Sequence, residues 1–258
     1  ISINAATTAN VTPNTLPASL TVAQATKLLD LADNDTSLRI TLKDTPANLA
    51  NQTALLTQDG VTSVVVDGAA TVAQAAAIHG ANVSVSYAVS DAATAFLNAD
   101  QAQAASITFA SNATVTPASV PANLTVAQTT KLLDLARNDD QLSITLKDTP
   151  ANLSAQTGAM NLTGVSSVVV DGAANVAQAT LIHGANAAVT YDVTDTTANL
   201  LGATGNALAT LESVKVGTVT ATNVPASLTV DQATKLLALA DNDSSLHINI
   251  VDSAANIA

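Results

Sequence analysis

Hydrophobic and polar residues alternate along several short stretches of this chain. In residues 38–43, Leu38, Ile40 and Leu42 oppose polar neighbours. A period of two is typical of a strand with one buried face. The pattern predicts strands at 38–43, 62–66, 83–89 and 106–110, with counterparts at 142–147, 166–170, 187–193 and 212–216. Residues 1–4 also alternate, whereas Val64, Val65 and Val66 form a continuous apolar run that predicts burial on both faces.

Alanine-rich segments with helical spacing lie between these strands. In residues 21–33 the apolar positions recur every three or four residues, which predicts an amphipathic helix with Thr21 as its N-cap. After Asp44 and Thr45, Pro46 suits the first turn of a second helix. Asp67 with Gly68, and Asp91, are expected to open the next helices. Gly80 and Gly184 are expected to end helices as C′ residues.

The chain repeats itself with a period of 104 residues. Pro17, Pro121 and Pro225 are equivalent, since 121 − 17 = 225 − 121 = 104, and residues 17–58 match residues 121–162 at 29 of 42 positions. This indicates a tandem duplication. We expect residues 1–16 to end a preceding repeat, 17–120 and 121–224 to form two copies, and 225–258 to begin a third, as an excerpt of a longer array.

The order of elements, β-α-β-α in units of 22–37 residues, favours a tandem α/β solenoid. Strands covered by helices on both faces read as continuous apolar runs. Most strands here have one Ser-, Thr- or Lys-rich face, so we expect one parallel sheet with all helices on one side, as in leucine-rich-repeat proteins. The alternative is a string of separate 104-residue α/β domains, although no Gly/Ser- or Pro-rich linker separates the copies.

Composition narrows the possible core and the possible partners. The chain is 48% hydrophobic but only 2% aromatic, with no Trp and one Met, which predicts a thin core of closely packed small side chains. The net charge of −12, with 8 Lys and Arg residues, argues against nucleic acid and anionic membrane surfaces. No apolar run is long enough to span a membrane. The absence of Cys excludes disulfides, thiol catalysis and Cys-ligated zinc.

The sequence contains no recognisable catalytic constellation. His79 and His183 are predicted at helix C-termini, where a cation suits the helix dipole, and His247 lies on an exposed strand face. Nucleophile-elbow and phosphate-loop patterns are absent from the sequence, so we expect no enzyme activity and no catalytic or cofactor-binding residues. One set of aspartates follows the strand ends and is expected to form a ladder of helix N-caps: Asp44, Asp67, Asp91, Asp148, Asp171, Asp195 and Asp252.

The loops Asp33-Asn34-Asp35 and Asp241-Asn242-Asp243 are the candidates for metal binding. Closely spaced carboxylate and amide oxygens suit calcium. The middle copy reads Arg137-Asn138-Asp139-Asp140, which places a cation in the pattern. Asp and Asn also favour ordinary turns, so calcium ligation and turn formation both stay open.

The segments LTVAQATKLL, ITLKDTPANL and VVVDGAATVAQA resemble repeats of very long secreted bacterial cell-surface proteins, adhesin-like or surface-layer-like, with Asp-X-Ala-Ala-Asn units. Asp252-Ser253-Ala254-Ala255-Asn256 is the best match to that unit. The resemblance extends over essentially the whole chain. It implies export, an extracellular location on a bacterial surface, and a structural or adhesive role.

The sequence therefore favours two possible functions. The first is an extracellular structural repeat protein of a surface layer, fibre or adhesin stalk, whose partners are neighbouring repeats or further copies. The second is a module that binds glycan or another surface through its Ser/Thr-rich sheet face. An enzyme is disfavoured because no residues have the geometry of a reaction site.

Overall fold

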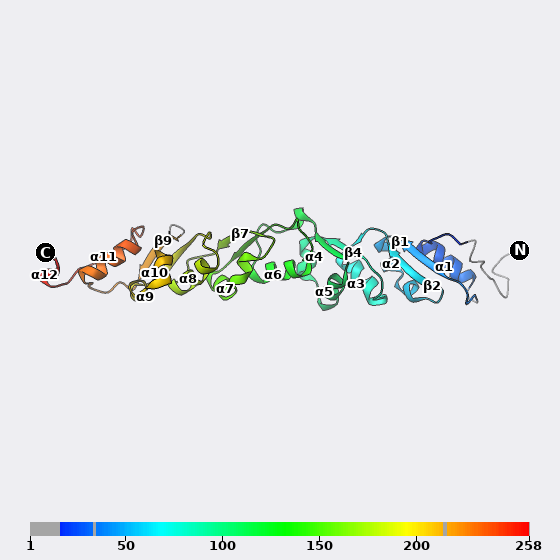
Figure 1. Cartoon of the computed structure of the whole chain (residues 1–258), viewed down its shortest axis with the longest axis horizontal. Helices are drawn as coiled ribbons and strands as arrows, with labels where there is room; N and C mark the ends of the chain where they lie inside the picture. The colour runs from blue at the N-terminus through cyan, green and yellow to red at the C-terminus, as the bar shows by residue number, and fades with distance from the viewer. Residues whose placement is uncertain (1–15, 33–34, 214–215, 258) are drawn as a thin grey trace. The chain divides into compact units, whose positions relative to one another are not determined.

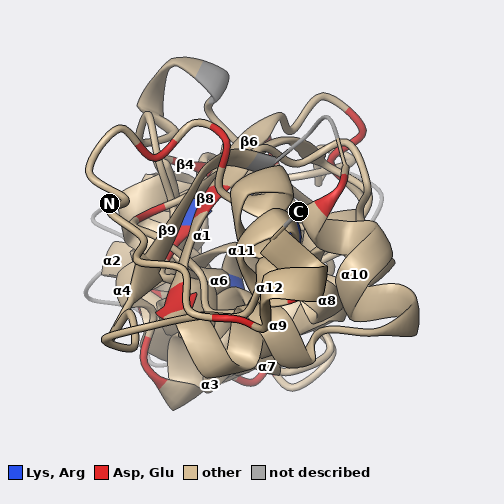
Figure 2. Cartoon of the chain, turned by 90° about the vertical axis from the view of Figure 1, so that its left-hand side faces the viewer, with Lys and Arg blue, Asp and Glu red and all other residues tan. Residues whose placement is uncertain are grey.

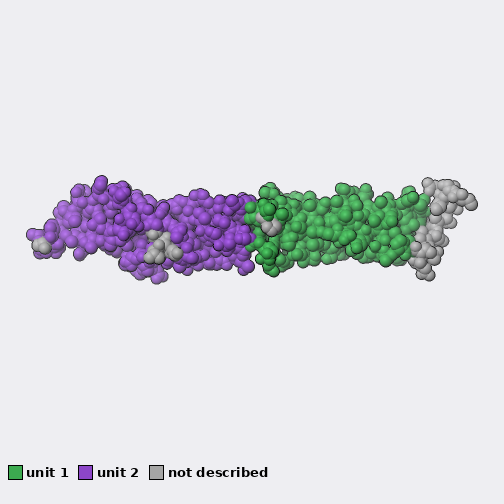
Figure 3. All heavy atoms as spheres, turned by 90° about the horizontal axis from the view of Figure 1, so that it is seen from above, with its two compact units in different colours: residues 1–120, 131–142 green, residues 121–130, 143–258 purple. Residues whose placement is uncertain are grey.

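The computed structural model describes residues 16–32, 35–213 and 216–257 of the chain (Figure 1). The predicted alternation at residues 1–4 lies outside this part. The described residues form a mixed α/β structure of helices and small parallel sheets. Contacts divide the chain into two compact units, one of residues 1–120 and 131–142, the other of residues 121–130 and 143–258 (Figure 3).

The described strands form four separate small sheets, and every pairing is parallel. The single long sheet predicted from the sequence is therefore not observed. The sheets are β1–β2, β3–β4–β5, β6–β7 and β8–β9, with bounds β1 Ile40–Asp44, β2 Val61–Val66, β3 Ala69–Ala70, β4 Ala88–Asp91, β5 Asn112–Val115, β6 Ile144–Asp148, β7 Val165–Val170, β8 Tyr191–Thr196 and β9 Val216–Thr222.

A glycine turn separates one small sheet from the next. Gly68 lies between β2 and β3 with φ of +98°, and Gly172 follows β7 with φ of +97°. A positive φ strains residues that carry a Cβ. The chain turns at Asp67-Gly68, so β2 pairs with β1 while β3 pairs with β4. This turn replaces the helix start that the sequence suggested there.

The helices begin largely where their capping residues predict. Thr21 forms a capping box with Gln24, and Thr45 caps the short helix that starts at Pro46, so both of these predictions are confirmed. The bounds are α1 Val22–Leu31, α2 Pro46–Asn51, α3 Val72–Ala81, α4 Ala93–Asn98, α5 Gln101–Phe109, α6 Val126–Leu135, α7 Pro150–Ala155, α8 Val176–Ala185, α9 Thr197–Gly202, α10 Gly205–Leu211, α11 Val230–Leu239 and α12 Ala254–Ile257. Short 3₁₀ helices occupy Thr53–Thr57, Pro117–Ser119 and Thr157–Asn161. None of the described helices has the length and apolarity to cross a membrane.

The structure reveals a repeat shorter than 104 residues. A Thr/Asn-Val-X-Gln motif opens the helix after a bridge residue at five places, starting at residues 21, 71, 125, 175 and 229. The spacing alternates between 50 and 54, so two spacings make the 104-residue period. We name the resulting segments module 1 (20–69), module 2 (70–123), module 3 (124–173), module 4 (174–227) and module 5 (from 228). Modules 1, 3 and 5 are odd; modules 2 and 4 are even.

Each module starts with one residue that pairs with the strand after the first helix. Leu20, Leu124 and Ala174 form single parallel bridges to that strand, Ala70 pairs with Val89 in the same way, and in module 5 Leu228 bridges to Ile250, which lies outside the named strands. In modules 1–4 the chain then runs through a helix, a strand that ends at an Asp or one residue after it, and a short helix. In modules 1–4 a second strand follows. The sheet order therefore follows the chain order in each of these modules.

Several predicted elements are wrong. Residues 106–110 belong to helix α5, because Asp100 and Gln103 form a capping box that starts the helix upstream. Accordingly Ser106 is buried and Phe109 is 57% exposed, the reverse of the predicted strand. In the predicted strand 212–216, Glu212 is the C-cap of α10 and Val216 begins β9, while residues 214 and 215 lie outside the described part. Gly80 and Gly184 lie inside α3 and α8 rather than after them.

The core consists of small aliphatic side chains from the helices and from one face of each strand. In β1, Ile40 and Leu42 are buried while Lys43 is exposed, which confirms the predicted alternation. Strand β2 differs, because Val65 is 42% exposed and Val64 only half-buried; the Val64–Val66 run is not buried on both faces. Acidic side chains, which outnumber basic ones 20 to 8, are marked in Figure 2.

Candidate functional site

The most regular polar feature is an aspartate at the end of the first long strand of modules 1–4, with Asp252 at the equivalent position of module 5. The Oδ2 of Asp44 accepts a hydrogen bond from the backbone nitrogen of Val22 at 2.9 Å, at the start of α1. Four further aspartates accept the same hydrogen bond from the first residue of the helix in their modules: Asp91 (3.0 Å), Asp148 (2.9 Å), Asp195 (2.9 Å) and Asp252 (3.0 Å). Each carboxylate meets a backbone donor that lacks an intrahelical partner and the positive end of a helix dipole.

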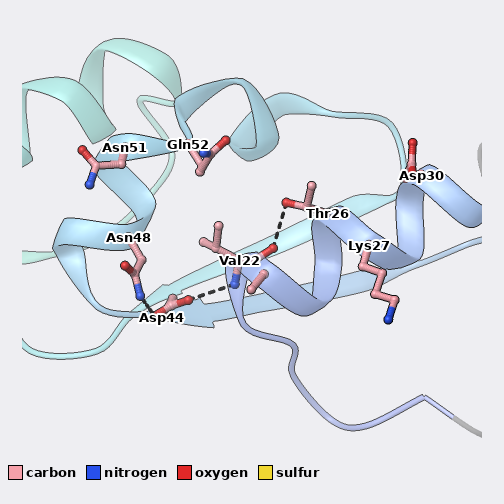
Figure 4. Close-up of a pocket in the computed structure, with 9 residues that line it drawn as sticks. Val22, Thr26, Lys27, Asp30, Asp44, Asn48, Asn51 and Gln52 are labelled. Atoms are coloured by element: carbon pink, nitrogen blue, oxygen red, sulfur yellow. Dashed lines mark hydrogen bonds between the residues drawn. The ribbon is translucent and has the colours of Figure 1, made fainter.

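The other carboxylate oxygen organises the short helix that follows. The Oδ1 of Asp44 accepts from the backbone nitrogen of Thr45 at 2.8 Å and from Asn48 Nδ2 at 2.7 Å (Figure 4). Asp148, Asp195 and Asp252 have the same two partners in their modules. Asp91 keeps only the backbone partner, because Ala95 stands where the others have Asn.

The predicted ladder of N-caps is therefore corrected. Thr45, Ala92, Thr149 and Thr196 occupy the N-cap positions, and the aspartate before each one connects the preceding helix to the following one. Asp67 and Asp171 do neither. They form exposed ion pairs with Lys43 at 3.9 Å and Lys147 at 3.3 Å.

These contacts lower the pKa of four of these carboxylates, those of Asp44, Asp148, Asp195 and Asp252. For Asp44, Asp148 and Asp195, burial alone would raise the pKa, but hydrogen bonds from backbone and Asn donors outweigh it and hold the pKa below the usual 3.8. For Asp252 the backbone N–H of Val230 is the main cause of the lowered pKa. The charged form of each side chain is therefore the form that the fold stabilises.

An open groove lies beside this aspartate in three modules. In module 1 it has a volume of about 850 Å³ and is lined by α1, α2 and Asp44 (Figure 4). Equivalent grooves of about 380 Å³ and 720 Å³ lie beside Asp91 and Asp195. Besides the aspartate, their walls carry mainly Ala, Val, Thr, Asn and Gln side chains, and the module 1 groove is also lined by Lys27 and Asp30.

Lysines join each even module to the odd module that follows it. Lys131 Nζ donates to the carbonyl oxygens of Leu97 at 2.7 Å and Ala99 at 3.0 Å. Lys235 Nζ donates to those of Leu201 at 2.7 Å and Ala203 at 2.9 Å. These carbonyls lie at the C-terminal ends of α4 and α9.

The same junctions are completed by an aspartate in the helix-to-strand loop. Asp139 Oδ2 accepts from the backbone nitrogen of Val115 at 2.8 Å, and Asp243 Oδ2 accepts from that of Ala221 at 3.4 Å. The junctions from odd to even modules are different. There α2 packs on α3 and α7 packs on α8, and Asn82 Nδ2 donates to the Leu56 carbonyl at 3.0 Å.

The calcium candidates lie in these helix-to-strand loops. Asp33 and Asn34 fall outside the described residues. Asp35 and Asp243 each accept hydrogen bonds on Oδ1 from the backbone and side chain of the serine two residues later, Ser37 and Ser245. Asn242 Nδ2 donates to the Gly217 carbonyl at 3.4 Å, and Asp241 is exposed. The loops thus form side-chain-stabilised turns.

Within the described ranges, no three or more His, Asp or Glu side chains are grouped as they would be around a metal ion. Calcium binding by Asp33, Asn34, Asp35, Asp241, Asn242 and Asp243 stays a prediction. The hydrogen bonds from Ser245 also hold the pKa of Asp243 below its usual value, although burial opposes this effect.

The histidines take structural positions. His79 and His183 lie in the last turns of α3 and α8, as predicted, and His247 is exposed. The His79 ring lies 4.7 Å from that of Phe109 and 6.4 Å from that of Tyr87. Burial raises the pKa of Tyr87 to about 12, so this phenol stays protonated and donates to the Ser106 carbonyl at 3.0 Å.

The junction lysines and the double role of the strand-end aspartates were not found from the sequence. Both sets of residues recur, but the contacts that reach a preceding helix are made to backbone atoms 19 to 34 residues away. No protein-family model and no curated protein sequence matches this chain.

Proposed function

We propose that this chain is a structural repeat protein, in which modules stack into a solenoid that forms part of an extracellular bacterial surface layer, fibre or adhesin stalk. The role is non-enzymatic. The observation that carries the proposal is the recurrence of two kinds of junction between neighbouring modules. Unit 1 contains one junction of each kind, and so does unit 2.

Recurring junctions support an array because each module needs only its neighbours. The junctions use main-chain carbonyls and amides together with a few Lys, Asp and Asn side chains. The helix pairs α2–α3 and α7–α8 recur at every second module, and so do the contacts of Lys131 and Lys235, whereas the Asn hydrogen bonds differ. The array therefore lengthens without any new kind of junction. The repeated sequence then gives a long protein that presents the same surface many times.

The burial of the strands supports a solenoid with its helices on one side. Strands β1 and β8 bury alternate residues and leave the residues between them exposed or half-buried. A strand covered by helices on both faces would bury both sets. The small sheets then succeed one another as separate groups of two or three strands, in place of the continuous sheet of leucine-rich-repeat proteins.

The extracellular location rests on composition and on the resemblance of the repeats. The chain has no Cys and a net charge of −12. A strongly acidic surface favours solubility and disfavours binding to polyanions. These properties suit a protein whose partners are further modules or further copies of itself.

A glycan- or surface-binding role is the second candidate, favoured by exposed hydroxyls on the edge strands. Thr62 and Ser63 in β2 and Ser166 and Ser167 in β7 are all exposed. Regularly repeated hydroxyls offer hydrogen bonds to a repeating polar ligand. Under this alternative the array would display binding strands at intervals of two modules.

The test is whether the purified segment assembles. We expect electron microscopy to show ordered sheets or filaments, and export of the full-length protein to place the repeats on the outside of the cell. Persistence of monodisperse monomers at high protein concentration, together with an intracellular location, would contradict the structural proposal. Binding to a glycan array without assembly would favour the second candidate.

A further inference from the structure

Lys131 and Lys235 each close the end of a short helix in the preceding module. Their ammonium groups donate to two carbonyl oxygens with nearly identical distances, 2.7 and 3.0 Å for Lys131 and 2.7 and 2.9 Å for Lys235. The last carbonyls of a helix lack intrahelical donors and carry the negative end of its dipole. An ammonium group with three donors satisfies them well. The repetition identifies a joint between modules.

Lys27 occupies the same place in module 1, since 131 − 27 = 104. Within residues 16–32, 35–213 and 216–257, its Nζ makes no hydrogen bond and no ion pair. Its side chain is exposed, whereas Lys131 and Lys235 are half-buried. Figure 4 shows Lys27 extending from α1 on the wall of the 850 Å³ groove, away from Asp44.

We propose that the face of module 1 around Lys27 is a docking surface for the C-terminal end of a short helix from a further even module. The ligand is a pair of carbonyls equivalent to those that Leu97 and Ala99 present to Lys131. The even modules of this chain do not supply it, because their own carbonyl pairs are bonded to Lys131 and Lys235. The occupant is another module of the same kind.

This assignment rests on the proposed stacking of modules and does not depend on where the protein is located. The proposal can be tested with a chain in which an even module is added before module 1. Residues 1–19 are replaced by a copy of residues 70–123, which restores the 34- and 32-residue spacings between the lysine and its two carbonyls. Mass spectrometry then measures the rate at which an amine-reactive reagent labels each lysine.

In the starting chain Lys27 should label faster than Lys131. In the extended chain we expect its rate to fall about fivefold, to that of Lys131, as the joint forms. Lys27→Met should lower the melting temperature of the extended chain by about 2–4 °C and leave the starting chain unchanged. Lys131→Met is the matched control, with an equal effect in both chains.

Fast labelling of Lys27 in an extended chain whose added module is folded would overturn the proposal. An equal effect of Lys27→Met in both chains would also overturn it. A second extended chain carries a copy of residues 174–227 instead, in case the copy of residues 70–123 does not fold at this position. If neither added module folds against module 1, this face does not accept an even module and the proposal is wrong.

Discussion

Asp148 and Val126 lie 22 residues apart, yet Oδ2 of Asp148 accepts a hydrogen bond from the backbone nitrogen of Val126 at 2.9 Å. The oxygen thus reaches the first donor of helix α6, while Oδ1 binds Thr149 and Asn152 at the start of α7. A single carboxylate connects two helices across the strand between them. Every module has an equivalent aspartate, and this contact fixes the position of the first helix relative to the end of the strand.

Replacing Asp148 should therefore be costly. Asp148→Ala leaves three donors without their partner, and we expect a loss of about 2–4 kcal/mol in the free energy of unfolding. Asp148→Asn should lose about 1–2 kcal/mol, because its amide group faces other donors. Urea denaturation measures both values. Asp171→Asn is the matched control: its ion pair with Lys147 is exposed, and the expected change is below about 1 kcal/mol. Equal losses at the two positions would contradict the role given to Asp148.

The same carboxylates predict a loss of stability in acid. The pKa values of Asp44, Asp148, Asp195 and Asp252 are lower in the folded chain than the usual 3.8. Groups with a depressed folded pKa contribute stability above their unfolded pKa and lose it as the pH falls through the folded value. Stability from these groups should be constant above about pH 5 and decline below about pH 4.

The urea midpoint between pH 7 and pH 2 tests this expectation. Asp148→Asn should show a shallower acid decline than the starting chain, because one of the titrating groups is gone. Asp171→Asn should retain the full decline. A midpoint that rises continuously from pH 5 to pH 2 would contradict the expectation, since relief of negative charge repulsion would then dominate.

The local elements could be predicted because their causes lie close together in the sequence. Thr21 with Gln24 and Thr45 with Pro46 specify helix starts within four residues. The alternation in residues 38–43 placed β1 and its buried face correctly. The predicted strand at residues 106–110 is wrong because Ile107 and Phe109 alternate with polar residues as in a strand. The capping residue that starts helix α5, Asp100, lies upstream of this segment.

The longer-range features could not be predicted in the same way. Lys131 and the Oδ2 of Asp148 bind backbone atoms, which every residue possesses, so the sequence does not mark these partners. The module length was visible in principle, because Thr-Val-Ala-Gln occurs at 21–24, 71–74 and 125–128. It was obscured by the strand patterns, which differ between odd and even modules.

The helix-to-strand loops give a test that separates turn formation from calcium binding. Hydrogen bonds from Ser245 and Ala221 occupy both oxygens of Asp243 without a metal. We expect Asp243→Ala to lower the free energy of unfolding by about 1 kcal/mol, equally in millimolar calcium and in chelator. Calcium that raises the melting temperature of the starting chain, with no such effect in Asp243→Ala, would instead establish the loop as a calcium site.

Thr129 offers a substitution that should stabilise the protein. It is fully buried in α6, and its Oγ1 has no hydrogen-bond partner in the described part of the chain. The equivalent positions in the other modules are Ala25, Ala75, Ala179 and Ala233, all buried. An unpaired buried hydroxyl costs about 1–3 kcal/mol, and Ala also favours a helix more than Thr does.

We therefore expect Thr129→Ala to raise the free energy of unfolding by about 1 kcal/mol, after the loss of one buried methyl group is subtracted. Thermal and urea unfolding measure the gain. Thr130→Ala is the matched control, because Thr130 is exposed and its Oγ1 donates to the Val126 carbonyl at 2.9 Å. It should change stability by less than about 0.5 kcal/mol. A destabilised Thr129→Ala would mean that the methyl group packs too well for the alanine of the other modules to replace it.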